Sequence, residues 1–253
     1  MKEILICNDD GIFAPGIQAL IESMRPLGRI TVVAPDSPQS GAGHGITLNS
    51  TLRINKVKDE ENLKMYSTSG TPVDCVKLAV NEIIQKKPDL LVSGINHGSN
   101  ASINVLYSGT MSAAMEGALE GIPSIGFSLL DHSIDADFES SKHVAQKIAV
   151  KVLETGLPWG VCLNVNIPKL SMQEIRGIKW CHQARGNWTE EFDGRTDPSG
   201  QKYFWLTGKF KLFDEDEEND IKSLEAGYVS VVPQQCDMTA YDVLKDMKSL
   251  NFD

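Results

Sequence analysis

Two acidic residues, Asp9 and Asp10, follow directly on a short apolar run near the start of the chain. Carboxylates this close repel each other, and one of them would tend to stay protonated unless a cation neutralises the pair. Oxygen ligands without sulfur or imidazole suit Mg²⁺ or Mn²⁺. The pair therefore indicates a divalent-cation site, although Asp9-Asp10-Gly11 taken alone would equally form an ordinary Asp-Gly turn.

Two later polar loops carry more oxygen ligands, each after another apolar run. The first contains Ser40 and Gly41, and the second contains Asn96 and Asn100. In open α/β sheets, ligands bind outside the carboxyl ends of the strands, so neighbouring strands would bring these loops to the two aspartates. Ser40 and Asn96 taken singly are most often turn formers, and only their convergence favours a metal site.

The segment Ser108-Gly109-Thr110 begins a stretch of small residues with helical spacing. A helix that starts this way presents backbone N–H groups and hydroxyls that suit a phosphate. An ordinary N-cap is the alternative, and taken alone it is the commoner case. The glycines of Gly41–Gly45 do not form GxGxxG, and no GxxxxGK[ST] occurs, so neither a dinucleotide site nor a P-loop is indicated.

The elements that would position these loops alternate between strand and helix. Apolar runs predict strands at residues 4–7, 30–34, 89–92, 122–127 and 161–167, with a hairpin within 46–68. Helical patterns predict a helix opened by Pro15-Gly16, and further helices from Thr71-Pro72 to about Gln85, over 110–120 and over 138–153. This order predicts a Rossmann-like, doubly wound α/β fold with a mainly parallel sheet, helices on both faces and right-handed crossovers.

The pattern changes after about Pro168, which divides the chain into a catalytic core at 1–168 and a C-terminal extension at 169–253. Strand-like pieces at 203–206, 210–213 and 228–232 predict a β-hairpin, and a terminal helix is expected near 241–250. Leu206 and Phe210 are among the bulky apolar residues in this charged segment. An isolated hairpin is marginal in water, so the extension is predicted to be an oligomerisation arm covered by a second copy. The alternative is an arm that folds back on its own core.

Composition excludes several functional classes. Acidic residues outnumber basic ones 34 to 24, for a net charge of −10, which disfavours sequence-independent coating of DNA or RNA. Six acids lie within 214–220, which indicates a solvated loop. No apolar run approaches the roughly 18 residues of a membrane helix, and the N-terminus lacks the features of a signal peptide. Five scattered cysteines without a CxxC pair indicate reduced thiols and a cytoplasmic protein.

A series of short motifs runs in order along nearly the whole chain. The motifs are Asn8-Asp9-Asp10-Gly11 with Pro15-Gly16-Ile17, Val33–Asp36 with Ser40-Gly41 and Gly43-His44, Ser69–Pro72 with Asp74–Val76, Ser93–Asn96 with Gly98 and Asn100, Tyr107–Thr110 with Ala113-Ala114 and Glu116-Gly117, Leu163–Pro168, and Gly227–Val231 with Pro233. Together they closely resemble the SurE survival-protein family of nucleotidases. Departures from the family pattern are concentrated at 182–226.

The resemblance implies a metal-dependent phosphatase that acts on nucleoside 5′- and 3′-monophosphates and, in some members, on polyphosphate. It implies that Asp9, Asp10, Ser40 and Asn96 bind one divalent cation per subunit, and these are the positions that the strand-end reasoning reaches separately. It also implies a homodimer or homotetramer built by exchange of C-terminal elements.

The predicted reaction is hydrolysis of a phosphate monoester, in which the cation binds a phosphate oxygen and activates a water. The phosphate would rest on Gly41, Asn100 and the helix start at Ser108–Thr110. His44 is a candidate proton donor to the leaving group, with a structural role in the glycine loop as the alternative. One rival function is a non-catalytic nucleotide-binding module, which two unneutralised carboxylates would oppose. A pure assembly protein is a second rival, which the full set of oxygen ligands disfavours.

Overall fold

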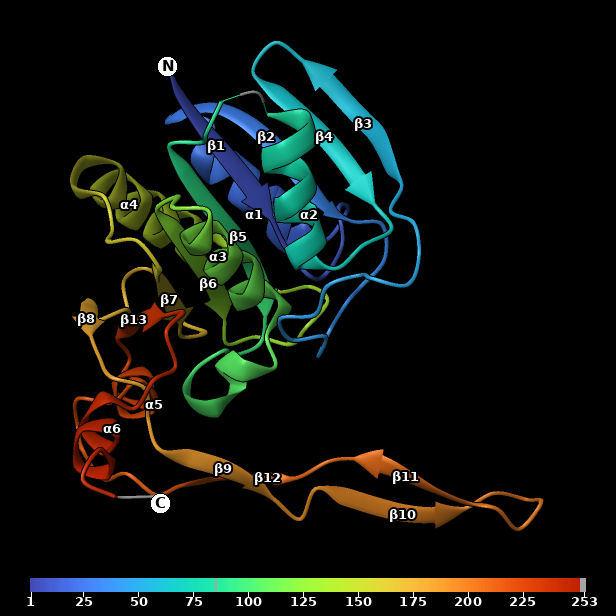
Figure 1. Ribbon diagram of the computed structural model, residues 1–253, viewed down its shortest axis with the longest axis vertical. Helices are drawn as coiled ribbons and strands as arrows, with labels where there is room; N and C mark the ends of the chain where they lie inside the picture. Colours follow the sequence, from blue (N-terminus) through green and yellow to red (C-terminus); the bar gives the residue numbers. More distant parts are fainter. Residues whose placement is uncertain (85, 251–253) are drawn as a thin grey trace.

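A nine-stranded sheet forms the centre of the molecule (Figure 1). The computed structural model describes residues 1–84 and 86–250. From edge to edge the strands are β3 (Ile54–Glu60), β4 (Leu63–Thr68), β2 (Gly28–Pro35), β1 (Lys2–Cys7), β5 (Leu90–His97), β6 (Ser124–Leu129), β7 (Val161–Ile167), β13 (Val229–Gln235) and β8 (Ile178–Trp180). Neighbours are parallel except for the pairs β3–β4 and β7–β13. The predicted mainly parallel, doubly wound α/β sheet is confirmed, and all five predicted apolar strands belong to it.

Helices cover both faces of the sheet. One face carries α1 (Pro15–Met24) and α4 (Glu139–Thr155), and the other carries α2 (Pro72–Leu78) and α3 (Gly109–Leu119). Successive strand residues point to opposite faces, so Ile4 and Ile6 share a core with α1 and α4, whereas Leu5 and Cys7 pack with α2. Burial on both faces explains why these strands are continuous apolar runs. Within the described part of the chain, no helix is long and apolar enough to cross a membrane.

The crossover through α4 has the opposite hand to the crossover through α3. The steps from β5 to β6 and from β6 to β7 run in the same direction along the sheet, yet their helices lie on opposite faces. α3 already covers β6 and β7 on its own face. Met111 of α3 packs with Cys162 on β7, and the Met111 Sδ would lie 2.3 Å from a Cβ placed on Gly126 of β6. The expectation of uniformly right-handed crossovers is therefore wrong for one of these two steps.

The helix predicted at Thr71-Pro72 begins there and is shorter than expected. Thr71 Oγ1 accepts a hydrogen bond from the Asp74 backbone N–H at 3.2 Å, and Asp74 Oδ2 accepts one from the Thr71 N–H at 2.9 Å. This reciprocal capping box fixes the start of α2. The helix ends at Leu78 and a π-helical turn, Ala79–Ile83, follows. Gln85, the expected end, lies outside the described residues.

The C-terminal part of the chain divides between the sheet and other elements. β13 pairs with β7 from Ser230–Asn166 to Gln235–Val161, and β8 adds to its other side. Val229 and Val231 join the main core. The boundary expected at Pro168 therefore does not coincide with a break in the sheet. α5 (Asp220–Glu225) precedes β13, and α6 (Tyr241–Met247), which has no buried residue, follows it.

A long two-stranded arm projects from the body of the molecule (Figure 1). Its strands are β9 (Gly186–Thr189), β10 (Phe192–Thr196), β11 (Lys202–Leu206) and β12 (Lys209–Leu212). β9 pairs with β12 at the base, and β10 pairs with β11 towards the tip. The strands expected at 203–206 and 210–213 are present, and each pairs with an earlier strand of the arm.

Candidate active site

A pocket of about 210 Å³ lies at the carboxyl ends of β1, β2 and β5. The chain leaves β1 for β2 on one side and returns to β5 on the other, so β1 and β5 meet at the switch point of the sheet. The pocket residues are Asp9, Asp10, Ser40, Gly41, Asn96, His97, Asn100, Asn104, Tyr107 and Ser108. The structure thus brings together all four residues predicted as oxygen ligands, along with three of those predicted to hold phosphate.

The Asp9 carboxyl is buried against the start of α3. Thr110 Oγ1 donates to Asp9 Oδ1 at 2.5 Å, and a Cβ on Gly109 would lie 2.6 Å from the Asp9 Cβ, so only glycine fits there. Burial raises the pKa of Asp9 to about 6; the hydrogen bond from Thr110 opposes this rise and the charge of Asp10 adds to it. Gly109 and Thr110 contact Asp9, and of this helix start only Ser108 lines the pocket, which differs from the role predicted for all three.

The Asp10 carboxyl has an oxygen without compensation. Asp10 Oδ2 is buried and has no hydrogen-bond partner among the described residues. Burial raises the pKa of Asp10, whereas the charge and the backbone N–H of His97 oppose the rise. An unpaired buried acceptor costs about 1–3 kcal/mol, and more when it is charged. The negative charge of the two neighbouring carboxyls is therefore only partly compensated.

Ser40 and Asn96 reach the pocket from the neighbouring strands. Asn96 Nδ2 donates to the carbonyl of Gly98 at 2.9 Å and to that of His97 at 3.3 Å, which leaves Oδ1 available as an acceptor. Ser40 lies on the loop after β2, whose start is fixed by the Gln39 N–H donating to the Asp9 carbonyl at 2.8 Å. Each side chain can thus present an oxygen beside the two carboxyls.

This donor set fits a hard divalent cation. It consists of two carboxylates, a hydroxyl and an amide oxygen, which are the ligands that Mg²⁺ and Mn²⁺ accept. In the described ranges, no three His, Cys, Asp or Glu side chains gather so as to hold a metal ion. The uncompensated Asp10 Oδ2 is the atom that a cation would neutralise.

A polar network inside the sheet holds Asn100. Its backbone N–H donates to Asn166 Oδ1 at 2.8 Å, its Nδ2 donates to Ser128 Oγ at 2.7 Å, and its carbonyl accepts from Asn164 Nδ2 at 2.8 Å. Asn164 and Asn166 lie fully buried on β7. Both asparagines belong to the Leu163–Pro168 motif, but neither was predicted to support the site. Their signal was polarity inside an apolar strand, since buried polar groups have to be paired.

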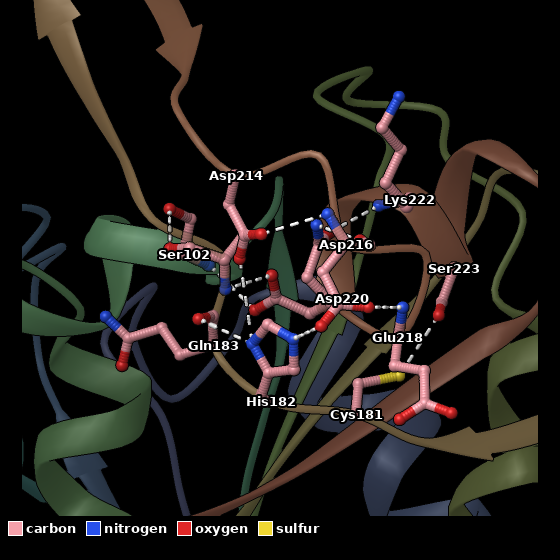
Figure 2. A network of polar contacts seen from close by, with 12 residues as sticks. Ser102, Cys181, His182, Gln183, Asp214, Asp216, Glu218, Asp220, Lys222 and Ser223 are labelled. Carbon is pink, nitrogen blue, oxygen red and sulfur yellow. Dashed lines mark hydrogen bonds and ion pairs between the residues drawn. The ribbon is translucent and has the colours of Figure 1, made fainter.

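The short 3-10 helix Ser102–Leu106, which carries Asn104 into the pocket, is held by the C-terminal part of the chain (Figure 2). Ser102, which is buried and has a φ of 54°, donates its N–H to Asp220 Oδ2 at 2.8 Å and its hydroxyl to the Ala184 carbonyl at 2.8 Å. Asp220 Oδ1 accepts from the Ala184 N–H at 3.0 Å. Burial raises the pKa of Asp220, although these hydrogen bonds oppose the rise. Residues 184 and 220 thus fix Ser102, which lies between the pocket residues Asn100 and Asn104.

The acidic run at 214–220 is partly structural. Figure 2 shows His182 between two of its members: Nε2 lies 3.2 Å from Asp216 Oδ2, and Nδ1 lies 3.8 Å from Asp214 Oδ2. A hydrogen bond with the Gln183 carbonyl and these carboxylates raise the pKa of His182, with burial opposing. Together with the buried Asp220, these contacts differ from the wholly solvated loop that composition suggested.

The loop that carries Ser40 is anchored a second time at the start of α2. Asp74 Oδ1 accepts from the Thr47 N–H at 3.1 Å, and Asp74 Oδ2 accepts from Thr47 Oγ1 at 2.6 Å. Thr71 Oγ1 donates to the Gly45 carbonyl at 2.7 Å. Burial acts to raise the pKa of Asp74, but the hydrogen bonds from Thr47 and Thr71 outweigh it and lower the pKa. The helix cap therefore also holds the glycine loop, a role for Thr47 that the sequence did not indicate.

His44 lies apart from the residues that line the pocket. Its Nε2 is 3.0 Å from Glu116 Oε2, and the buried Glu116 also pairs with Lys77 at 2.5 Å. Burial acts to raise the pKa of Glu116, but the hydrogen bonds from His44 and Lys77 outweigh it and lower the pKa. This arrangement ties the glycine loop to α2 and α3, which favours the structural alternative for His44. Its role as a proton donor stays a prediction.

The fold and the chain have known counterparts. The family described as Survival protein SurE matches residues 4–190. The chain belongs to the SurE family. It is 60% identical over 248 residues to the 5′-nucleotidase SurE of Christiangramia forsetii, covering 97% of this chain and 95% of that one. It is 58% identical to the 5′-nucleotidase SurE of Flavobacterium psychrophilum, covering 97% and 96%. The crystal structure of the SurE protein from Aquifex aeolicus matches with a TM-score of 0.85 and 42% identity, covering 97% of this chain and 98% of that chain.

Proposed function

We propose that this pocket hydrolyses nucleoside 5′-monophosphates to nucleoside and phosphate, as a 5′-nucleotidase. The proposal rests on two adjacent carboxyls with raised pKa values at the switch point, one of them with a buried oxygen lacking any partner among the described residues. Such a pair needs a cation to neutralise its charge. A cation bound in the crevice at the strand ends can in turn bind the anionic group of a phosphate ester. The names of the SurE relatives at 60% and 58% identity support the same reaction.

Asp9, Asp10, Ser40 and Asn96 would hold one divalent cation, Mg²⁺ or Mn²⁺. When bound, the cation would polarise the phosphoryl group and lower the pKa of a water molecule. The chain itself keeps the carboxyls in place: Thr110 orients Asp9 through a hydrogen bond of 2.5 Å. The start of α3 offsets negative charge there by about 0.3–1 kcal/mol.

The phosphate seat would combine Gly41, Asn100 and Ser108, which line the same pocket. Ser108 Oγ accepts from the Met111 N–H at 3.1 Å, so its own O–H can donate to a phosphate oxygen. The Asn100 backbone is held by the β7 asparagines and its side chain by Ser128 on β6, which reduces the entropy lost on binding. Gly109 and Thr110 would contribute through Asp9. His44 would have to release Glu116 before it could give a proton to the leaving oxygen.

Phosphate release from a panel of substrates tests this function. Nucleoside 5′- and 3′-monophosphates and polyphosphate would each be assayed with Mg²⁺ or Mn²⁺, and again with excess EDTA. Cation-dependent release of phosphate from the 5′-monophosphates is expected. Phosphate release from the 3′-monophosphates or from polyphosphate would extend the activity to those substrates. Undiminished release after exhaustive chelation would contradict the metal site. Binding without release in the presence of the cation would favour the non-catalytic nucleotide-binding module.

We further propose that the protein works in the cytoplasm as a homodimer or homotetramer. All five cysteines are free thiols, which is typical of a reducing compartment. Phe192 and Phe204 on the arm are 67% and 63% exposed, and α6 buries none of its residues. A second copy of the chain would cover these apolar surfaces.

A further inference from the structure

A second pocket, of about 590 Å³, opens beside the candidate active site. It is lined by Tyr107, Asn187, Trp188, Glu191, Leu206, Thr207 and Gly208. Tyr107 lines both pockets. A hydrogen bond of 2.9 Å from Trp188 Nε1 to Asn104 Oδ1 joins a residue of the second pocket to a residue of the first. The two spaces are therefore neighbours with shared walls.

The Trp188 ring is fixed in place and remains only partly covered. Phe210 packs against it edge-to-face, with ring centroids 5.8 Å apart and an interplanar angle of 72°. Its indole N–H is held by Asn104. Gly208 has a φ of 135°, and a Cβ there would lie 3.3 Å from Trp188 Cε3, so a glycine keeps this side of the ring open. A fixed aromatic surface of this kind loses little entropy when a flat ligand stacks on it.

We infer that the second pocket binds the purine or pyrimidine base of the nucleotide, an inference that rests on the proposed nucleotidase function. In a nucleoside monophosphate the sugar separates the base from the phosphate, so a base site has to lie next to the phosphate site and apart from it. Aromatic and apolar walls with a few polar groups are typical of such sites. Trp188, Tyr107 and Leu206 supply the flat and apolar surface, and Glu191 and Thr207 supply polar groups for the edge of a base.

The inference gives the base of the arm a role in substrate selection. Trp188 lies on β9, and Leu206 and Gly208 lie at the end of β11 and the turn that follows it. The matched family segment ends at residue 190, so Glu191, Leu206 and Thr207 lie beyond it. Base preference would then be set largely by residues of the arm, whereas the phosphate chemistry is set by the strand ends.

Trp188→Ala tests the base site through selectivity. The ratio of kcat/KM for AMP to kcat/KM for ribose 5-phosphate would be measured, because the second substrate lacks a base. Loss of a stacking residue costs about 1–3 kcal/mol per base, so the ratio should fall on the order of tenfold. Trp188→Phe, which keeps a ring and loses the N–H, should retain most of the ratio. Trp180→Ala, which removes an exposed indole on β8 at the far edge of the sheet, should not change it.

Equal losses on both substrates would show that Trp188 acts only through Asn104, and the inference would fall. Adenosine binding, measured by calorimetry without any turnover, separates this result from failure of the nucleotidase proposal. Wild-type protein that binds adenosine, with binding lost in Trp188→Ala, supports the base site even if no phosphate is released. Adenosine binding that is absent, or equal in both proteins, overturns it.

Discussion

At the scale of single residues, replacing either aspartate by asparagine is expected to lower activity without lowering the stability of the metal-free protein. Asp9→Asn and Asp10→Asn each remove a charged side chain from the proposed cation site, so each should lower kcat/KM by more than the roughly 100-fold that marks the upper range for outer-shell changes. In metal-free protein the same changes relieve repulsion between two carboxyls that burial already disfavours. The melting temperature in EDTA should therefore stay the same or rise. A fully active Asp10→Asn variant would require a different set of ligands.

Thr110 is expected to act through Asp9. Thr110→Val keeps the shape of the fully buried side chain but removes the hydroxyl that donates to Asp9 Oδ1 at 2.5 Å. We expect kcat/KM to fall by about 10–100-fold, the range for groups that orient a ligand. Thr110→Ser, which keeps the hydroxyl, serves as the matched control. Steady-state kinetics at saturating cation measures the effect, and equal activity of the valine and serine variants would exclude it.

The four candidate ligands could be proposed from sequence because they lie at, or shortly after, the carboxyl ends of strands. Asp9 and Ser40 lie in loops whose preceding apolar runs predict parallel neighbours, and such neighbours end at one edge of a sheet. Contacts between residues far apart in the sequence leave no local pattern of this kind. The pairing of His44 with Glu116 joins residues 72 positions apart, and the support of Asn100 by Asn166 spans 66. These partners become visible only once the helices and β7 are in place.

At the scale of elements, the start of α2 links helix stability to the loop that carries Ser40. Asp74→Ala removes the cap and both contacts to Thr47, and should lower the free energy of unfolding at pH 7 by about 1–2 kcal/mol. The pKa of Asp74 lies below its ordinary value of 3.8 in the folded protein. Its contribution is therefore present above that value and is lost as the pH falls through the folded pKa.

Urea unfolding at pH 7 and at about pH 3 measures this dependence. The difference between wild type and Asp74→Ala should shrink at the lower pH. Asp59→Ala, which removes an exposed carboxylate paired with the exposed Lys56, should change stability little at either pH. A difference for Asp74→Ala that is equal at both pH values would show that its carboxylate charge does not contribute.

Element types followed from periodicity, whereas some of their partners did not. The strands of the core were predictable because burial on both faces makes them unbroken apolar runs, as in Ile4–Cys7. The sequence of β13 looks the same whether the strand pairs with β7 or with a strand of the arm, since an alternating pattern does not specify a partner. The face taken by α4 likewise depends on α3 already covering the other face of β6 and β7.

At the scale of the whole molecule, the arm presents one apolar face without a covering element. Gly194 opposes Phe204 and lies two residues from Phe192, so Phe192 and Phe204 lie on the same side of the ribbon, because side chains alternate along a strand. Trp205 and Asp193 lie on the other side. A two-stranded ribbon has no core of its own, and a symmetric second copy is the simplest cover for such a face.

Light scattering at micromolar concentration should therefore report a mass at least twice the 27.7 kDa of one chain. Phe204→Glu places a charge within the apolar face and should lower that mass. Tyr203→Glu introduces the same charge on the opposite side of the same strand and should leave it unchanged. A wild-type mass of 27.7 kDa would mean that the arm stands alone in solution.

A truncation after Pro168 should in contrast yield an insoluble or unfolded product, because it removes β13 and exposes the whole edge of β7 from Val161 to Asn166.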